Sequence, residues 1–237
     1  MTLDIGAVLA DARSLWQRDR ALLIRLAAPF LFLPALAAFL LLPPFTVPDA
    51  ADAVARQQAM VDWYLANAPA LIAQKAVELF GALAVLVLYL DRSHRTVGEV
   101  LKRAALLFPA LLLAAVMVWA ILAAGLFAFV IPFCYAVGRL ALVGPALVAE
   151  GKTAPGQAIA RSFALTERRG WALFGVMAAV AIGGVAATIV VRALGAVAGT
   201  SLIATTIVDM LAAAIASLAV LARTLIVVAL YRRATTR

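Results

Sequence analysis

The sequence predicts an all-α membrane protein with six transmembrane helices and three cytoplasmic interfacial amphipathic helices. Six long apolar stretches contain few charges, and the Lys and Arg residues between them fall on alternate connections. Hydrophobic residues make up 66% of the chain and charged residues 14%, where a soluble domain has roughly 45–50% and about 25%. A soluble core of this size cannot bury so much apolar side chain.

The apolar stretches predict the spans, since roughly 20 apolar residues cross the hydrocarbon core of a bilayer. The first span is longer than the apolar region of a signal peptide, and the tail before it mixes Asp with Arg, so we expect it to be retained. We expect one integral membrane domain, residues 1–237, with spans near 21–42, 72–90, 104–130, 133–148, 171–193 and 203–231.

The basic residues predict the orientation, because Lys and Arg beside spans stay on the cytoplasmic side. Fourteen Lys and Arg residues lie in the two terminal tails and in the second and fourth connections, whereas the first, third and fifth connections contain only Arg56. We therefore expect both termini to be cytoplasmic in a bacterial inner membrane. Clusters at span ends account for the net charge of +8, so nucleic-acid binding is not expected. The cytoplasmic set is Arg13, Arg18, Arg20, Arg92, Arg95, Lys102, Arg103, Lys152, Arg161, Arg168, Arg169, Arg232, Arg233 and Arg237.

Three cytoplasmic segments resemble one another and predict a threefold repeat of an interfacial helix followed by a transmembrane hairpin. When their second residues, all glycine, are aligned, apolar positions coincide and recur at spacings of three, four and seven residues. Such a stripe, with Arg and Lys on the remaining arc, suits a helix lying in the membrane interface. Thr96 and Glu99 predict a capping box at the second start. The segments read IGAVLADARSL from Ile5, VGEVLKRAALL from Val97 and PGQAIARSFAL from Pro155.

The outer connections are unequal in length. The first, about 43–71, predicts an amphipathic helix from Asp49 to Asn67 with aromatic side chains at headgroup level. The third consists of Ile131 and Pro132 only, and the fifth is rich in Gly and Ala. A large extracytoplasmic domain is therefore not expected.

Five charged residues within spans form a predicted intramembrane polar cluster. Lys75 and Glu78 are three residues apart and pair on one helix face. Asp209 and Arg223 share a face of the last span but lie about 21 Å apart along it, and Arg139 is placed by its depth to meet Glu78 or Asp209. Such a cluster is either an interhelical clamp or a polar cavity for an anionic headgroup or a proton-coupled solute.

Two more arginines, Arg25 and Arg192, lie near span ends, where we expect them to extend toward the headgroups. The fifth span also carries a stripe of small residues that is typical of a helix contact inside a protein. Its members are Gly175, Ala179, Gly183 and Ala187.

We expect no catalytic site, metal or cofactor. His94 is the only histidine and lies in a basic loop, without Cys or His partners at the spacing that zinc or haem requires. The complete phosphate-binding pattern Gly-x-x-x-x-Gly-Lys-Ser/Thr is absent. Cys134 is the only cysteine, so no intrachain disulfide forms.

The densest pattern runs from the fourth span into the third interfacial helix. From Ile131 it reads IPFCYAVGRLALVGPALVAEGKTAPGQAIARSFALTERRGW. It resembles the membrane domain fused to some bacterial glycerophosphodiester phosphodiesterases and related six-span inner-membrane families, although Phe133 replaces a glycine of their pattern. A phosphodiesterase domain is not expected within these residues, so that activity is not implied. The matching positions are Pro132, Tyr135, Arg139, Pro145, Glu150, Gly151, Ala158, Ser162, Leu165 and Thr166.

This pattern is interpreted as a structural corner. Pro145 leaves a carbonyl without its usual donor, Glu150 and Gly151 end the span, and Ser162 is placed to hydrogen-bond a neighbouring backbone. The alternative is a cytoplasmic site for lipid or a partner protein at Glu150 and three arginines. The candidate lipid headgroup contacts are Arg161, Arg168 and Arg169.

These observations predict a non-enzymatic multi-pass inner-membrane protein that organises lipid, anionic lipid included, or a partner protein, with a homo-oligomer as one form of partner. The alternative is a small transporter or lipid translocase with a buried polar site. A water-accessible cavity reaching the intramembrane charges favours transport, whereas a dry, paired cluster favours the organising role.

Overall fold

The computed structural model describes residues 4–46, 52–91, 96–151, 154–197 and 201–235. Within these ranges the chain is helical and forms no strand. Predictions on Asp49, Arg92, His94, Arg95, Lys152 and Arg237 fall outside them. Six helices in the described ranges are long and apolar enough to cross a membrane, and they match the six predicted spans in order: Ile5–Leu41, Ala53–Leu90, Val97–Phe127, Val130–Ala149, Gly170–Gly195 and Leu202–Thr235.

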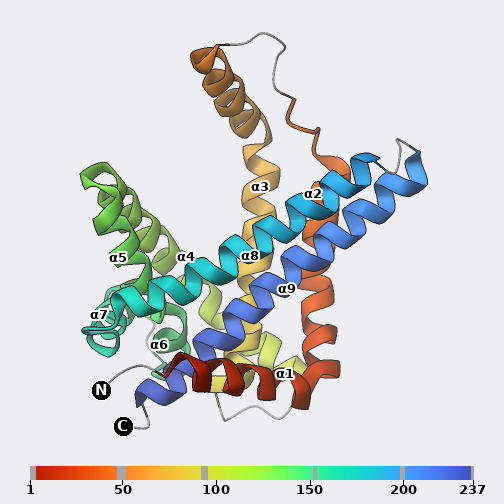
Figure 1. Ribbon diagram of the computed structural model, residues 1–237. Coiled ribbons are helices and arrows are strands. Elements are labelled where there is room, and N and C mark those ends of the chain that lie inside the picture. Colours follow the sequence, from red (N-terminus) through yellow and green to blue (C-terminus); the bar gives the residue numbers. More distant parts are fainter. Residues whose placement is uncertain (1–3, 47–51, 92–95, 152–153, 198–200, 236–237) are drawn as a thin grey trace.

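The first span is built from α1 (Ile5–Ala27), a π-helical turn η1 (Ala28–Phe32) and α2 (Leu33–Leu41). α1 bends at Asp19, whose φ of −116° and ψ of 19° are not helical. Residues 5–18 therefore run across the end of the molecule while the rest of α1 turns upward (Figure 1). The π-helical turn packs against Gly81, where an added Cβ would come within 2.6 Å of the Phe30 Cβ.

Helix α3 (Ala53–Leu90) contains both the predicted outer amphipathic helix and the second span. The prediction of two separate helices was wrong, since 38 residues, about 57 Å, continue through Pro69. Pro69 removes one backbone hydrogen bond, and the upper part of α3 leans away from the lower part (Figure 1). Trp63 anchors the preceding loop by donating from Nε1 to the Pro43 carbonyl at 3.0 Å.

Helix α4 (Val97–Ala128) likewise joins the second predicted interfacial helix to the third span without a break. The predicted capping box is confirmed, because the Thr96 side chain bonds the Glu99 N–H and the Glu99 side chain bonds the Thr96 N–H. The turn into α5 (Val130–Leu140) is at Phe129 rather than at Ile131 and Pro132. Pro132 fits in the first turn of α5, where a missing N–H loses no helical bond.

The remaining helices are α6 (Val143–Ala149), α7 (Pro155–Leu165), α8 (Gly170–Val197) and α9 (Leu202–Thr235). Buried side chains gather at one end, along residues 83–89, 140–148 and 221–231. At the other end large apolar side chains are exposed, as Phe127 (94%) and Leu202 (82%) show. Figure 1 shows the start of α1 and the end of α9 at the buried end, and the α4–α5 and α8–α9 hairpins pointing away from each other above it. We call residues 5–18, 83–91, 140–151, 154–169 and 221–235 the base.

Candidate functional site

The fourth span is broken near the base, at Ala141 and Leu142, between α5 and α6. Pro145 explains the break, because its ring would collide with the Ala141 carbonyl in a continuous helix. Ser162 of α7 satisfies the freed backbone groups: its Oγ donates to the Arg139 carbonyl at 2.7 Å and accepts from the Leu142 N–H at 3.2 Å. The predicted bond from Ser162 to a neighbouring backbone is therefore confirmed.

Thr166 adds to the same link between α7 and the break. Its Oγ1 lies 3.2 Å from the Arg139 carbonyl and 2.6 Å from the Ser162 carbonyl. The side chains of Ser162 and Thr166 are both fully buried. Because unpaired polar groups are costly in such a place, these hydroxyls hold α7 in one position against the fourth span.

A close backbone contact lies beside this link, where α5 crosses the start of α8. A Cβ added to Gly138 would overlap the carbonyl of Gly170, and one added to Gly170 would meet the Tyr135 ring. Glycine at both positions allows the two backbones to touch. Gly138 and Gly170 were not predicted as contact residues, although Gly138 directly precedes Arg139 of the recurring pattern.

Arg139 lies between two aromatic rings rather than against a carboxylate. Its guanidinium carbon is 5.6 Å from the centre of the Tyr135 ring and 5.0 Å from that of Phe163. Its Nε is buried without a hydrogen-bond partner. Among the described residues, no hydrogen bond or ion pair joins Arg139 to Glu78 or Asp209. The expected meeting of Arg139 with one of these carboxylates was therefore wrong.

Glu150 ends α6 and connects it to two other helices. Its Oε1 accepts from Arg161 of α7 at 2.6 Å and from the Tyr231 hydroxyl of α9 at 3.2 Å. Gly151 follows with a φ of 60°, a left-handed conformation that glycine adopts without strain and that commonly ends a helix. Arg161 is thus engaged within the protein, whereas Arg168 in the following turn is exposed.

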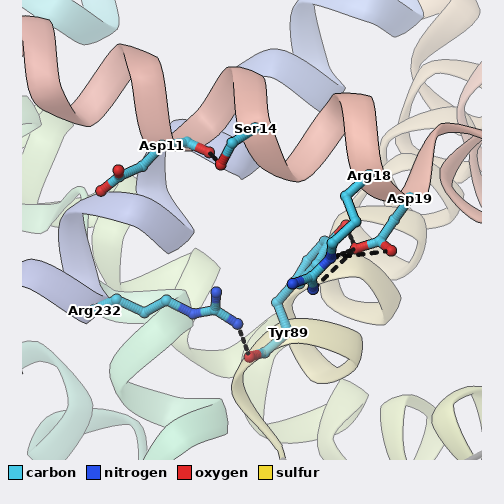
Figure 2. Close-up of polar contacts among 6 residues, drawn as sticks. All are labelled: Asp11, Ser14, Arg18, Asp19, Tyr89 and Arg232. Carbon is cyan, nitrogen blue, oxygen red and sulfur yellow. Dashed lines mark hydrogen bonds and ion pairs between the residues drawn. The ribbon is translucent and has the colours of Figure 1, made fainter.

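The bend of α1 is held at the base by α3 and α9. Figure 2 shows the Tyr89 side chain reaching α1, where its hydroxyl donates to Asp19 at 3.0 Å beside Arg18. The Arg232 guanidinium donates to the Tyr89 carbonyl at 2.7 Å. Tyr89 therefore links the end of α3 both to the point where α1 turns into the first span and to the last turn of α9.

The sixth residue counted from the aligned glycine of each repeated segment makes an ion pair with the end of a span. Arg103 pairs with Asp91 after α3 at 3.3 Å, and Arg161 pairs with Glu150 at 2.6 Å. The corresponding residue of α1, Asp11, pairs with Arg233 near the end of α9. The third pair reverses the signs of the other two.

Three of the other predicted intramembrane charges, Lys75, Glu78 and Asp209, take part in two separate ion pairs. Lys75 bonds Glu78 at 2.7 Å within α3, as the spacing indicated. Asp209 bonds Arg192 across the α8–α9 hairpin at 3.1 Å, and the Arg192 guanidinium carbon lies 4.8 Å from the centre of the Phe39 ring. Arg192 was expected to extend toward headgroups, so this partner was missed.

Arg223 is exposed on α9 and has no ion pair among the described residues. The small-residue stripe of α8 also faces outward in part, since a Cβ on Gly175 or Gly183 would meet nothing within 4 Å. The expectation of an internal contact along this stripe was therefore wrong at these positions. Neighbouring Gly184 makes the contact instead, against Ala219 of α9.

A cavity of about 320 Å³ lies between α1 and α9 at the base. Its wall on α1 is formed by Leu9, Ala12, Arg13 and Trp16, and its wall on α9 by Leu218, Leu221, Ala222, Leu225 and Ile226. This cavity was not predicted from the sequence, although both walls carry residues at spacings of three, four and seven, the pattern of facing helices.

In the part of the chain that the structure describes, no three His, Cys, Asp or Glu side chains are grouped as metal ligands. Comparisons with family models, with curated proteins and with solved structures found no match.

Proposed function

We propose that this protein is a non-enzymatic membrane component that organises lipid at the cytoplasmic leaflet, with its base toward the cytoplasm as the basic residues predict. The observation that carries the proposal is the pairing of the intramembrane carboxylates: Glu78 with Lys75 and Asp209 with Arg192. The Asp209–Arg192 pair ties α8 to α9, and the Glu78–Lys75 pair lies within α3. A proton-coupled translocase needs carboxylates that are free to change protonation.

The internal repeat belongs to this proposal, and three features support it. α1, α4 and α7 all begin one residue before the aligned glycine. The equivalent residues Val8, Val100 and Ala158 are buried, as are Ala12, Ala104 and Ser162. The three ion pairs occupy one equivalent position. Three units of one interfacial helix and one hairpin would then close into a ring, with α1 docked on the end of the last span.

The Asp209–Arg192 pair tests the organising role. Asp209→Leu leaves Arg192 without its partner and should lower the free energy of unfolding by about 1 kcal/mol, in the range of polar contacts between membrane helices. Asp209→Asn keeps a hydrogen-bond acceptor and should have a smaller effect. Thermal unfolding of the purified protein in one detergent measures both.

The double variant Asp209→Leu/Arg192→Leu is the matched control, because it removes both charges and should recover part of the loss. Uptake or lipid movement in liposomes is measured alongside. Unchanged stability in Asp209→Leu, together with loss of a transport signal that the wild type has, would favour the translocase instead.

The Asp11–Arg233 pair tests the closure of the ring. Asp11→Arg and Arg233→Asp each place like charges together, so each should lower the melting temperature and speed trypsin cleavage after Arg13 and Arg18 as α1 detaches. The double exchange should reverse both effects. Arg20→Asp makes the same change of charge as Arg233→Asp, but at an exposed residue of α1, and should do neither. If the double exchange is no better than the single ones, the pair does not hold α1.

A further inference from the structure

The cavity between α1 and α9 has mainly apolar walls, and each wall includes a small residue. On α1 the wall includes Ala12, and on α9 it includes Ala222. Leucines on both helices form much of the remaining wall. An apolar cavity of this kind is poorly hydrated and favours an apolar occupant.

Its depth places the cavity beside lipid chains. Leu225 precedes Arg233 by eight residues, or about 12 Å along α9, so the cavity wall reaches from the base into the apolar part of the span. At about 320 Å³ the cavity is near the lower end of ligand pockets, which are roughly 300–1,000 Å³. A packed helix, with a diameter of about 10–12 Å, is too large for it.

One cation stands at this cavity. Arg13 is the charged residue in its lining, is exposed, and makes no hydrogen bond or ion pair among the described residues. Trp16 lies one turn further along α1 and is half-buried, with an apolar ring and a polar N–H. A guanidinium and an indole beside an apolar space complement a phosphate joined to a hydrocarbon chain.

We propose that this cavity binds one acyl chain of an anionic phospholipid of the leaflet at the base, with the lipid phosphate at Arg13. The site rests on the proposed function, since it supplies the place at which that function would hold lipid. The bound chain fills the space between α1 and α9, and the phosphate provides the counter-charge that Arg13 lacks within the protein. This lipid is distinct from any at Arg161, which is bonded to Glu150.

The test compares lipid retained by the purified protein. Wild type, Arg13→Gln, Ala222→Phe and Ala222→Leu are purified in a mild detergent, and bound phospholipid is measured by mass spectrometry. Each is also placed in nanodiscs of phosphatidylcholine, with and without phosphatidylglycerol, for thermal melting. Ala222→Leu is the milder filling variant in case phenylalanine disturbs folding. Arg20→Gln is the control for loss of one positive charge on α1.

We expect wild type to retain phosphatidylglycerol and to melt higher with it. Arg13→Gln should lower the preference for phosphatidylglycerol about fivefold, as expected for one basic residue at an anionic surface. The filling variants should lose the retained lipid and melt alike in both nanodiscs, while Arg20→Gln behaves as wild type.

The opposite results separate this site from the proposed function. If wild type retains lipid and both filling variants retain as much, the lipid is bound elsewhere and the site is wrong while the proposed function stands. If the filling variants lose lipid but Arg13→Gln keeps the preference for phosphatidylglycerol, the role of Arg13 is wrong. If wild type retains no lipid and gains nothing from phosphatidylglycerol, the site and the proposed function both fail.

Discussion

Gly138→Ala should lower the stability of the bundle more than other substitutions of comparable size. The added methyl group would overlap the Gly170 carbonyl, which is backbone and cannot rotate away. Overpacking usually costs about 1–3 kcal/mol, and a backbone obstacle places this variant at or above the upper end. We expect a fall in melting temperature of roughly 10 °C, since 1 kcal/mol corresponds to about 2–4 °C at this chain length.

Gly175→Ala is the matched control, because it makes the same change in a helix where a Cβ would meet nothing within 4 Å. Alanine is favoured over glycine inside helices by about 0.5–1 kcal/mol, so this variant should melt slightly higher than the wild type. We therefore expect the melting temperature to fall in Gly138→Ala and to rise slightly in Gly175→Ala. Equal effects would mean that α5 and α8 do not touch at Gly138.

Ser162→Ala should have the second large effect. The substitution removes the acceptor of the Leu142 N–H and one of the two hydroxyls at the Arg139 carbonyl, in a buried position. An unsatisfied buried group costs about 1–3 kcal/mol. We expect a loss of that size in the free energy of unfolding, measured by chemical or thermal denaturation in detergent.

Ser217→Ala provides the comparison, because Ser217 is also a buried serine on a helix. Its hydroxyl donates at 2.6 Å to the Ala213 carbonyl, which also accepts a backbone hydrogen bond within α9. Removal of the hydroxyl therefore leaves no backbone group unpaired. We expect a change within about 0.5 kcal/mol. A similar loss in both variants would show that Ser162 contributes packing only, and that the break in the fourth span is held by Thr166.

The positions of the spans could be predicted because the hydropathy of a segment depends only on the residues of that segment. Helix starts were equally readable: Thr96 and Glu99 cap α4 as expected, and α7 begins at Pro155. Local signals did not reveal where a helix continues. Separate helices were expected on either side of residues 68–71 and at the end of the second repeated segment. α3 and α4 continue there instead, because one proline or a change of polarity does not outweigh the hydrogen bonds of a long helix.

The candidate site depended on contacts between distant residues, and here the sequence was less informative. The spacing of Lys75 and Glu78 identified their pair, since both lie on one helix. Asp209 and Arg192 lie on different helices, and their pairing follows from how α8 and α9 pack. The closeness of Gly138 to Gly170 and the cavity beside Arg13 likewise depend on how two helices cross, which periodicity along one helix does not determine.

The reversed signs of the Asp11–Arg233 pair bear on how the chain avoids assembling incorrectly. Arg103 and Arg161 have their carboxylates only 12 and 11 residues away, so they meet them as soon as each segment folds. The partner of Asp11 lies 222 residues later in the chain, so the ends of the second and fourth spans are made before it. Both of those ends carry a carboxylate, Asp91 or Glu150, and repel Asp11. Charge repulsion thus disfavours docking of α1 on the earlier span ends, and α1 docks on the end of α9 once that helix has been made.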